Sequence, residues 1–152
     1  MSNNTYLMVY LRTYVLRLIN DLSLKELSTI PQGFNNNIVW NVGHLIATDQ
    51  RVWYMRSGLT PPVEPNFIAR YQKGTKPTVF VEEAEVIQIK QLLFFSLEQF
   101  EADLNSHLFA DYETWATPYG NTIHTIEEAT NFLPFHEGLH IGCIKSLKQL
   151  VS

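Results

Sequence analysis

Residues 125–151 read TIEEATNFLPFHEGLHIGCIKSLKQLV, a stretch with the pattern of one long amphipathic helix. Thr125 and Glu128 form a capping-box signature, in which each side chain is expected to accept a hydrogen bond from the other residue's free amide. Apolar residues then recur at helical spacing, at Ile126, Ala129, Leu133, Ile144, Leu147 and Val151. This stretch therefore predicts a helix that begins at Thr125 and buries one face.

Three earlier segments show the same periodicity. The first carries Leu7, Leu11, Tyr14, Leu18 and Leu22, and the third carries Val86, Ile89, Leu93, Leu97, Phe100 and Leu104. The second follows the asparagine-rich FNNN at 34–37, whose last residues are good N-caps, and carries Ile38, Val42, Leu45, Ile46 and Trp53 up to Ser57 and Gly58. No segment shows strand-like alternation. Residues 1–152 are therefore predicted to form a single all-α domain, a four-helix bundle.

The connection between the second and third helices, residues 57–81, is long and rich in proline. Proline at this density does not continue a helix, so the segment is expected to be a crossover loop. It is long enough to run the length of the bundle, which allows the second and third helices to be parallel. Its aromatic residues Phe67, Tyr71 and Phe80 indicate that it packs on the bundle, and we expect it to cover one open end.

Composition excludes several classes of protein. The chain has 152 residues and a net charge of −4, without the basic stripe that a general nucleic-acid-binding protein needs. One cysteine, Cys143, fits a reducing compartment. The apolar N-terminal stretch is interrupted by Arg12 and Arg17, so it does not resemble a signal peptide, and no apolar run is long enough to cross a membrane. We expect a cytoplasmic protein.

His136, Glu137 and His140 match H-E-x-x-H, a pattern of helical zinc sites. Extending the apolar stripe from Leu133 places both histidines on the buried face, one turn apart, where they can converge on one metal ion. A metalloprotease needs a third ligand further along the chain, but the metzincin position holds Ser146 and no later helix exists. Cys143 lies too far along the helix axis and is interpreted as a core thiol.

A third ligand is therefore expected from another helix. His44 lies beside the apolar stripe of the second helix, and Gly43 before it would let a neighbouring helix approach closely. His107, at the end of the third helix, and His124, in the next loop, are expected to be exposed or capping, although His107 stays a candidate ligand.

The segment NNIVWNVGHLIATDQRVW, followed much later by FLPFHEGLHIG, resembles the DinB-like superfamily, which includes the bacillithiol transferases. The resemblance implies an up-down-down-up four-helix bundle, a divalent metal ion held by His44, His136 and His140, and a homodimer. Many relatives read H-x-G-Q where this chain reads HIGC, ending at Cys143, so a polar contact near the metal is expected to be missing.

A divalent ion held by three neutral histidines can present a thiol as its thiolate, and the resemblance favours metal-dependent transfer of a low-molecular-weight thiol to an electrophile, with zinc or nickel as the metal. A metal-dependent hydrolase with Glu137 as base, or a non-catalytic metal-stabilised binding or stress protein, are the alternatives. Glu137 points about 100° away from His136, so a solvated or interface carboxylate explains it equally well.

Candidate pocket residues are the aromatic Trp40, Trp53, Tyr54, Tyr71, Trp115 and Tyr119, and the arginines Arg51 and Arg56, which could recognise a carboxylate. The first helix is apolar on more than one face, which predicts a dimer interface there.

Overall fold

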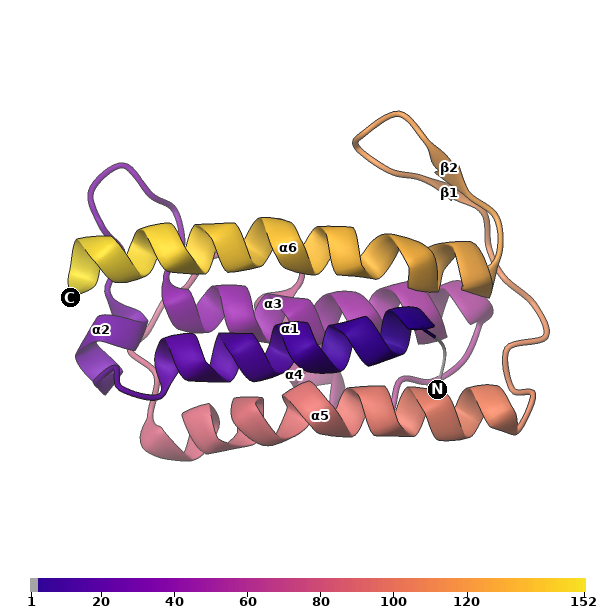
Figure 1. The fold of residues 1–152 in the computed structure, drawn as a ribbon, viewed down its shortest axis with the longest axis horizontal. Coiled ribbons are helices and arrows are strands. Elements are labelled where there is room, and N and C mark those ends of the chain that lie inside the picture. The colour runs from indigo at the N-terminus through magenta and orange to yellow at the C-terminus, as the bar shows by residue number, and fades with distance from the viewer. Residues whose placement is uncertain (1–2) are drawn as a thin grey trace.

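The computed structural model describes residues 3–152 and is mainly helical (Figure 1). The long helices are α1 (Asn3–Ile19), α3 (Ile38–Asp49), α5 (Glu83–Asn105) and α6 (Ile126–Val151), and the short ones are α2 (Leu24–Ser28) and α4 (Pro65–Tyr71). A π-helical turn (Gln50–Tyr54) and a 3-10 turn (Met55–Ser57) extend α3 to Gly58, where the second helix was predicted to end. No helix among the described residues is long and apolar enough to cross a membrane.

The four long helices lie side by side (Figure 1). Helices α1 and α6 run in one direction, and α3 and α5 run in the other. Each of α1 and α3 contacts both α5 and α6. Since α3 and α5 are parallel, the segment between them returns along the length of the molecule, as its length predicted.

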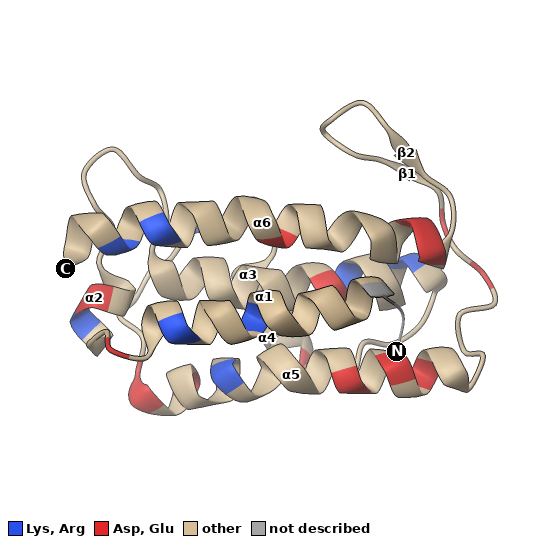
Figure 2. Cartoon of the chain, in the orientation of Figure 1, with Lys and Arg blue, Asp and Glu red and all other residues tan. Residues whose placement is uncertain are grey.

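The predicted caps are found at both helices. The Asn37 side chain accepts a hydrogen bond from the backbone amide of Trp40 and begins α3. Thr125 accepts one from the amide of Glu128, but the Glu128 carboxylate accepts from His124 rather than from Thr125, so the box is only half formed. Figure 2 shows acidic residues at the start of α6 and basic residues near its end, which complements the helix dipole.

The crossover between residues 57 and 81 is more ordered than predicted. It contains α4, whose first residue is Pro65, a position where the missing amide of proline breaks no hydrogen bond. Phe67 and Tyr71 are buried, and α4 packs along α3 rather than over one end of the molecule. The prediction that Phe80 packs inward is wrong, because its side chain is 67% exposed.

A short hairpin, not predicted from the sequence, precedes α6. Strand β1 (Trp115–Ala116) pairs antiparallel with β2 (Thr122–Ile123), and the loop projects beyond the helices (Figure 1). Strands of two residues are too short to show alternation of apolar and polar residues, so the sequence carried no periodic signal for them.

Helix α1 buries a different face from the predicted one. Leu7 and Tyr14 are 44% and 40% exposed, whereas Met8, Val15 and Ile19 are buried. The buried face also includes Arg12, which is fully buried although it is a charged residue. The predicted stripe was therefore rotated toward solvent, because the apolar pattern by itself does not allow for a buried arginine.

Arg12 belongs to a polar layer in the middle of the core, formed with Asp49, Ser96 and Glu137 from the other three long helices. Its guanidinium contacts Glu137 Oε1 at 2.5 Å and Asp49 Oδ2 at 2.6 Å. It also donates to the Leu93 carbonyl at 2.7 Å. Apolar core residues lie on both sides of this layer along each helix, so the layer divides the core into two halves.

Candidate metal centre

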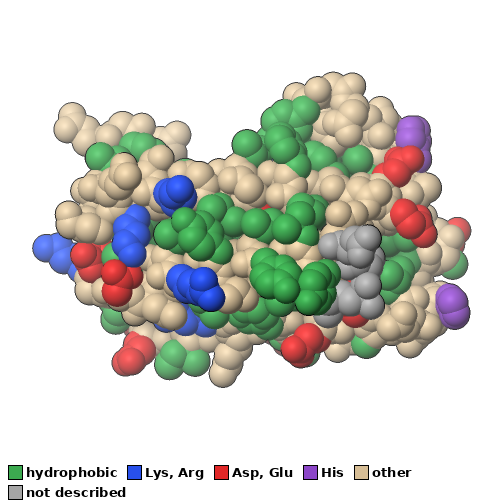
Figure 3. All heavy atoms as spheres, in the orientation of Figure 1, with side chains coloured by type: hydrophobic (Ala, Val, Ile, Leu, Met, Phe, Trp, Pro, Cys, Tyr) green, Lys and Arg blue, Asp and Glu red, His purple; other side chains and the backbone are tan. Residues whose placement is uncertain are grey.

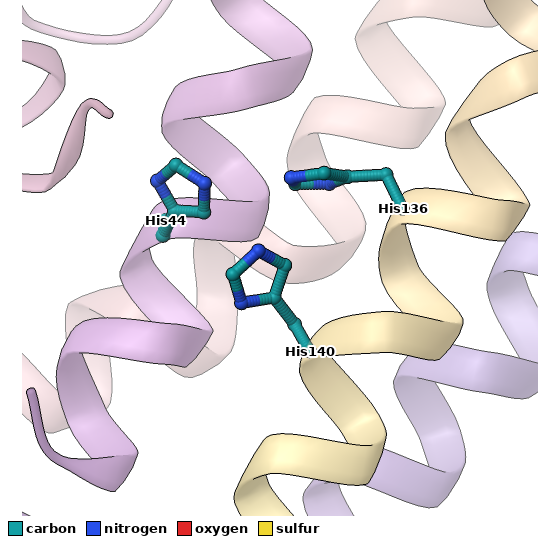
Figure 4. Close-up of side chains that lie close together, drawn as sticks. All are labelled: His44, His136 and His140. Atoms are coloured by element: carbon teal, nitrogen blue, oxygen red, sulfur yellow. The ribbon is translucent and has the colours of Figure 1, made fainter. Parts of the chain in front are cut away.

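Three histidine side chains converge where α3 faces α6 (Figure 4). His44 comes from α3, and His136 and His140 come from successive turns of α6. One ring nitrogen from each lies within 4.8 Å of those of the other two. The ring centroids are 4.5 Å apart for His136 and His140, and 4.7 Å apart for His44 and His140. The sequence-predicted histidines are thus brought together from residues nearly a hundred positions apart.

The neighbours of His44 hold its ring in place. The Tyr71 carbonyl lies 2.7 Å from His44 Nδ1, and the Trp40 ring stacks on the imidazole at 4.7 Å between centroids. A carbonyl can only accept a hydrogen bond, so Nδ1 carries the proton and Nε2 keeps its lone pair. Tyr71 approaches this closely because it packs directly over Gly43, which has no side chain. The close approach predicted at Gly43 is therefore made by α4.

All three imidazoles are held in the neutral form that binds metal ions. Burial and the nearby His140, His44 and Arg12 lower the pKa of His136 to about 3. Burial and His44 lower the pKa of His140 to about 4. Burial also lowers the pKa of His44. The nearby cations Arg51 and Lys73 lower it further, whereas the hydrogen bond to the Tyr71 carbonyl raises it. Neutral imidazoles are the form in which histidine coordinates metals.

The three donors fit a single divalent ion. Nitrogen ligands of a tetrahedral zinc ion lie about 2.05 Å from it, which places any two of them about 3.3 Å apart. The observed nitrogens lie within 4.8 Å of one another, so small side-chain rotations close the remaining difference. Three protein ligands leave a coordination position open, as in catalytic rather than structural zinc sites.

An open cavity of about 750 Å³ leads to the histidines. Its walls come from α3 and its extension, the residues after α4, the hairpin and α6. The predicted pocket residues that line it are Trp40, Trp115, Tyr119, Arg51 and Arg56. Trp53 instead stacks on Phe100 in the core, and Tyr54 donates a hydrogen bond to Asp103. The sequence did not single out Lys73, which also lines the cavity.

Comparison with known families matches residues 8–144 to the DinB superfamily. The chain belongs to the DinB superfamily. The match spans α1 to α6 and includes all three histidines. Members of this superfamily often bind metal ions, and the histidine cluster of this DinB chain is compatible with that property. No curated protein matches the chain.

Glu137 of this DinB chain turns away from solvent and into the polar layer. Its side chain is 1% exposed, with Oε1 bonded to Arg12 and Oε2 without a hydrogen-bond partner among the described residues. The expectation of a solvated or interface carboxylate is therefore wrong, and we assign Glu137 no proton-transfer role. Burial raises the pKa of the Glu137 carboxyl group, and the positive charge of Arg12 opposes this rise. The buried stripe of α6 passes through Glu137, while His136 and His140 are half-buried beside it.

The remaining candidate ligands lie outside the cluster. His107 and His124 are exposed, His107 just after α5 and His124 in the segment before α6. Cys143 is half-buried and packs against the apolar core, and burial raises the pKa of its thiol. A polar contact to the site does exist despite Cys143, since Asn41 Oδ1 lies 2.8 Å from His140 Nδ1. No hydrogen bond to either ring nitrogen of His136 is found among the described residues.

Proposed function

We propose that this chain is a metal-dependent thiol transferase, in which His44, His136 and His140 hold one divalent ion, zinc or nickel. The scaffold is an up-down-down-up four-helix bundle whose third ligand comes from the helix facing the two-histidine helix. The resemblance to bacillithiol transferases favours a low-molecular-weight thiol as one substrate and an electrophile as the other. A cytoplasmic, reducing environment would keep that thiol and Cys143 in the reduced form.

One observation carries this proposal: the three neutral imidazoles lie at the wall of an open cavity of about 750 Å³. A structural zinc site is closed by four protein ligands, whereas this one has three and faces space large enough for a small molecule. His44, His136 and His140 would hold a divalent ion there, which would lower the pKa of a bound thiol and so favour the thiolate, the nucleophilic form.

The reaction is a substitution at the electrophile. The thiol proton is released to solvent, the sulfur forms a bond to the electrophilic carbon, and the leaving group departs with its bonding electron pair. The chain's contribution is to hold the two substrates together in a partly dry site. Trp115, Tyr119 and Phe132 line one wall of the cavity and offer an apolar surface for the electrophile.

The charge of the cavity favours a negatively charged substrate. Arg51, Arg56 and Lys73 line it together with one acid, Glu113. Arg56 is paired with Glu113 at 3.1 Å, whereas Arg51 donates to the neutral Gln72. Neither Arg51 nor Lys73 has an ion pair with a described carboxylate, so both are free to bind a carboxylate of the substrate.

The test of the proposal compares metal-stripped protein with protein reloaded with zinc or nickel. A panel of thiols is combined with monobromobimane, chlorodinitrobenzene and an epoxide, and product formation is followed. We expect a rate above the metal-stripped control that the His44→Ala variant loses. No metal-dependent rate with any pair overturns the transferase proposal, and turnover of ester or amide substrates without thiol would replace it with a hydrolase.

The preference for negative charge is tested with two thiols of similar size and opposite charge. Mercaptopropionate carries a carboxylate and cysteamine an ammonium group. We expect mercaptopropionate to be the better substrate and the Arg51→Gln variant to lose most of that preference. Equal use of both thiols by the unaltered protein contradicts the charge argument without affecting the transferase proposal.

We also propose that two copies associate through α1. Tyr6, Leu7, Tyr10 and Tyr14 are exposed, and Figure 3 shows hydrophobic side chains gathered over α1 and α6 on one face. Burying such a patch against its symmetric copy removes apolar area from water. Light scattering over a dilution series tests this: a mass that stays at the 17.6 kDa of one chain at high concentration contradicts the dimer. The Tyr10→Arg variant is expected to be monomeric.

A further inference from the structure

Asn41 connects the two helices that supply the metal ligands. It lies in the first turns of α3, three residues before His44, and its side chain is fully buried. Its Oδ1 lies 2.8 Å from Nδ1 of His140 on α6. A buried amide in this position either accepts a hydrogen bond from the imidazole or donates one to it, and only the first case leaves Nε2 unprotonated and free for a metal ion.

The other contacts of Asn41 decide between these cases. The amide nitrogen Nδ2 donates to the backbone carbonyl of Asn37 at 2.8 Å and lies 3.0 Å from Oδ1 of Asn36. A backbone carbonyl has no hydrogen to donate, so the NH₂ group must face Asn37. The rotated amide would place two acceptors against each other there. Oδ1 is therefore the atom that faces His140.

We infer that Asn41 is a positioning residue that selects the tautomer of His140 with the proton on Nδ1, which leaves Nε2 as the metal ligand. An amide oxygen can only accept, so a neutral imidazole facing it at Nδ1 must donate from that atom. The Tyr71 carbonyl, at the end of α4, does the same for His44. Both ligands are thereby oriented before any metal arrives.

His136 differs from these two ligands. It has no such partner among the described residues, so it is the ligand left to adjust when an ion enters. Metal sites commonly orient their histidines through such outer contacts, and the loss of one weakens metal affinity by roughly 10- to 100-fold. The inference about affinity rests on the proposed metal site, whereas the tautomer can be measured without a metal.

The first experiment is nitrogen-15 NMR of the metal-free protein near neutral pH, which distinguishes the two neutral tautomers. We expect His140 to carry its proton on Nδ1 in the unaltered protein. The Asn41→Leu variant removes the acceptor and is expected to shift His140 toward the tautomer with the proton on Nε2. A proton on Nε2 of His140 in the unaltered protein overturns the inference, and this result does not depend on how the variant folds.

The second experiment measures zinc affinity by competition with a chelator. We expect Asn41→Leu to bind zinc roughly 10- to 100-fold more weakly than the unaltered protein. Thr130→Val is the matched control, because Thr130 is also buried and hydrogen-bonded but does not touch a histidine. Equal losses in Asn41→Leu and Thr130→Val overturn the inference. Absence of zinc binding by the unaltered protein overturns the metal site itself, while the NMR result still decides the tautomer.

Discussion

Near the candidate metal centre the Tyr71 ring packs directly over Gly43, and one added methyl group tests this contact. A Cβ at position 43 would lie 2.5, 2.6 and 2.8 Å from three atoms of the Tyr71 ring. Carbon atoms normally approach to about 3.5–4.0 Å, so the Gly43→Ala variant creates an overlap of about 1 Å. The Tyr71 ring is 3% exposed, packs beside Phe67 and donates a hydrogen bond to Glu85, so it has little freedom to move.

The expected effect follows from two opposing terms. Overpacking of a buried site costs about 1–3 kcal/mol, whereas replacing a helical glycine by alanine stabilises a helix by up to about 1 kcal/mol. Gly142 is the matched control, since it is also inside a helix but an added Cβ meets nothing within 4 Å. The Gly142→Ala variant therefore gains the helix stabilisation without any steric cost. The difference between the two variants isolates the steric cost of about 1–3 kcal/mol.

Thermal and urea unfolding followed by circular dichroism measure this difference. For a chain of this length, each kcal/mol corresponds to roughly 2–4 °C in Tm, so Gly43→Ala should melt about 2–12 °C below Gly142→Ala. Movement of α4 would also withdraw the Tyr71 carbonyl from His44, so zinc affinity should fall in Gly43→Ala and not in Gly142→Ala. If both variants are stabilised equally, α4 does not pack on Gly43 and the account of how His44 is oriented is wrong.

Three further predictions concern the site and the polar layer. The His44→Ala variant should lose the bound metal and Cys143→Ala should retain it, as measured by metal analysis; the opposite result would overturn the ligand set. In metal-free protein the depressed pKa of His136, about 3, means that the unfolded chain binds a proton below about pH 6.5 while the folded chain does not. Stability is therefore fully present above that pH and falls on acidification, by about 2 kcal/mol at pH 5 for this residue, and His136→Phe should unfold with a weaker pH dependence. Arg12→Met leaves two buried carboxylates without their cation and should destabilise the protein by about 3–5 kcal/mol, partly recovered by adding Glu137→Gln; urea unfolding that shows no loss would contradict the polar layer.

The polar layer explains why the helix faces in the middle of the protein differ from the sequence prediction. Arg12 and Glu137 are charged, so neither belonged to the predicted apolar stripes, although each is buried. They are buried because each is the other's partner, with Asp49 as the third member. These partners are 37 and 125 positions from Arg12 in the chain, and no local pattern links residues at such distances.

What the sequence determined by itself is local. The all-α class, the four long helices and the caps at Asn37 and Thr125 follow from signals within a few residues, because capping and helical periodicity act over one or two turns. His136 and His140 were also paired by local spacing, since one helical turn separates them. The third histidine was a candidate from its place beside the apolar stripe and next to Gly43, but only the resemblance to a family selected His44 as the third ligand.

The tertiary structure decided everything that depends on two or more elements together. It brought His44 against the α6 pair, placed the Tyr71 carbonyl and Asn41 beside their rings, and turned Glu137 away into the core. It also converted part of the crossover into α4 and formed the hairpin that walls the cavity. Burial of a charge or orientation of a ligand depends on which groups lie opposite it, and those groups come from helices distant in sequence, so only the packed fold specifies them.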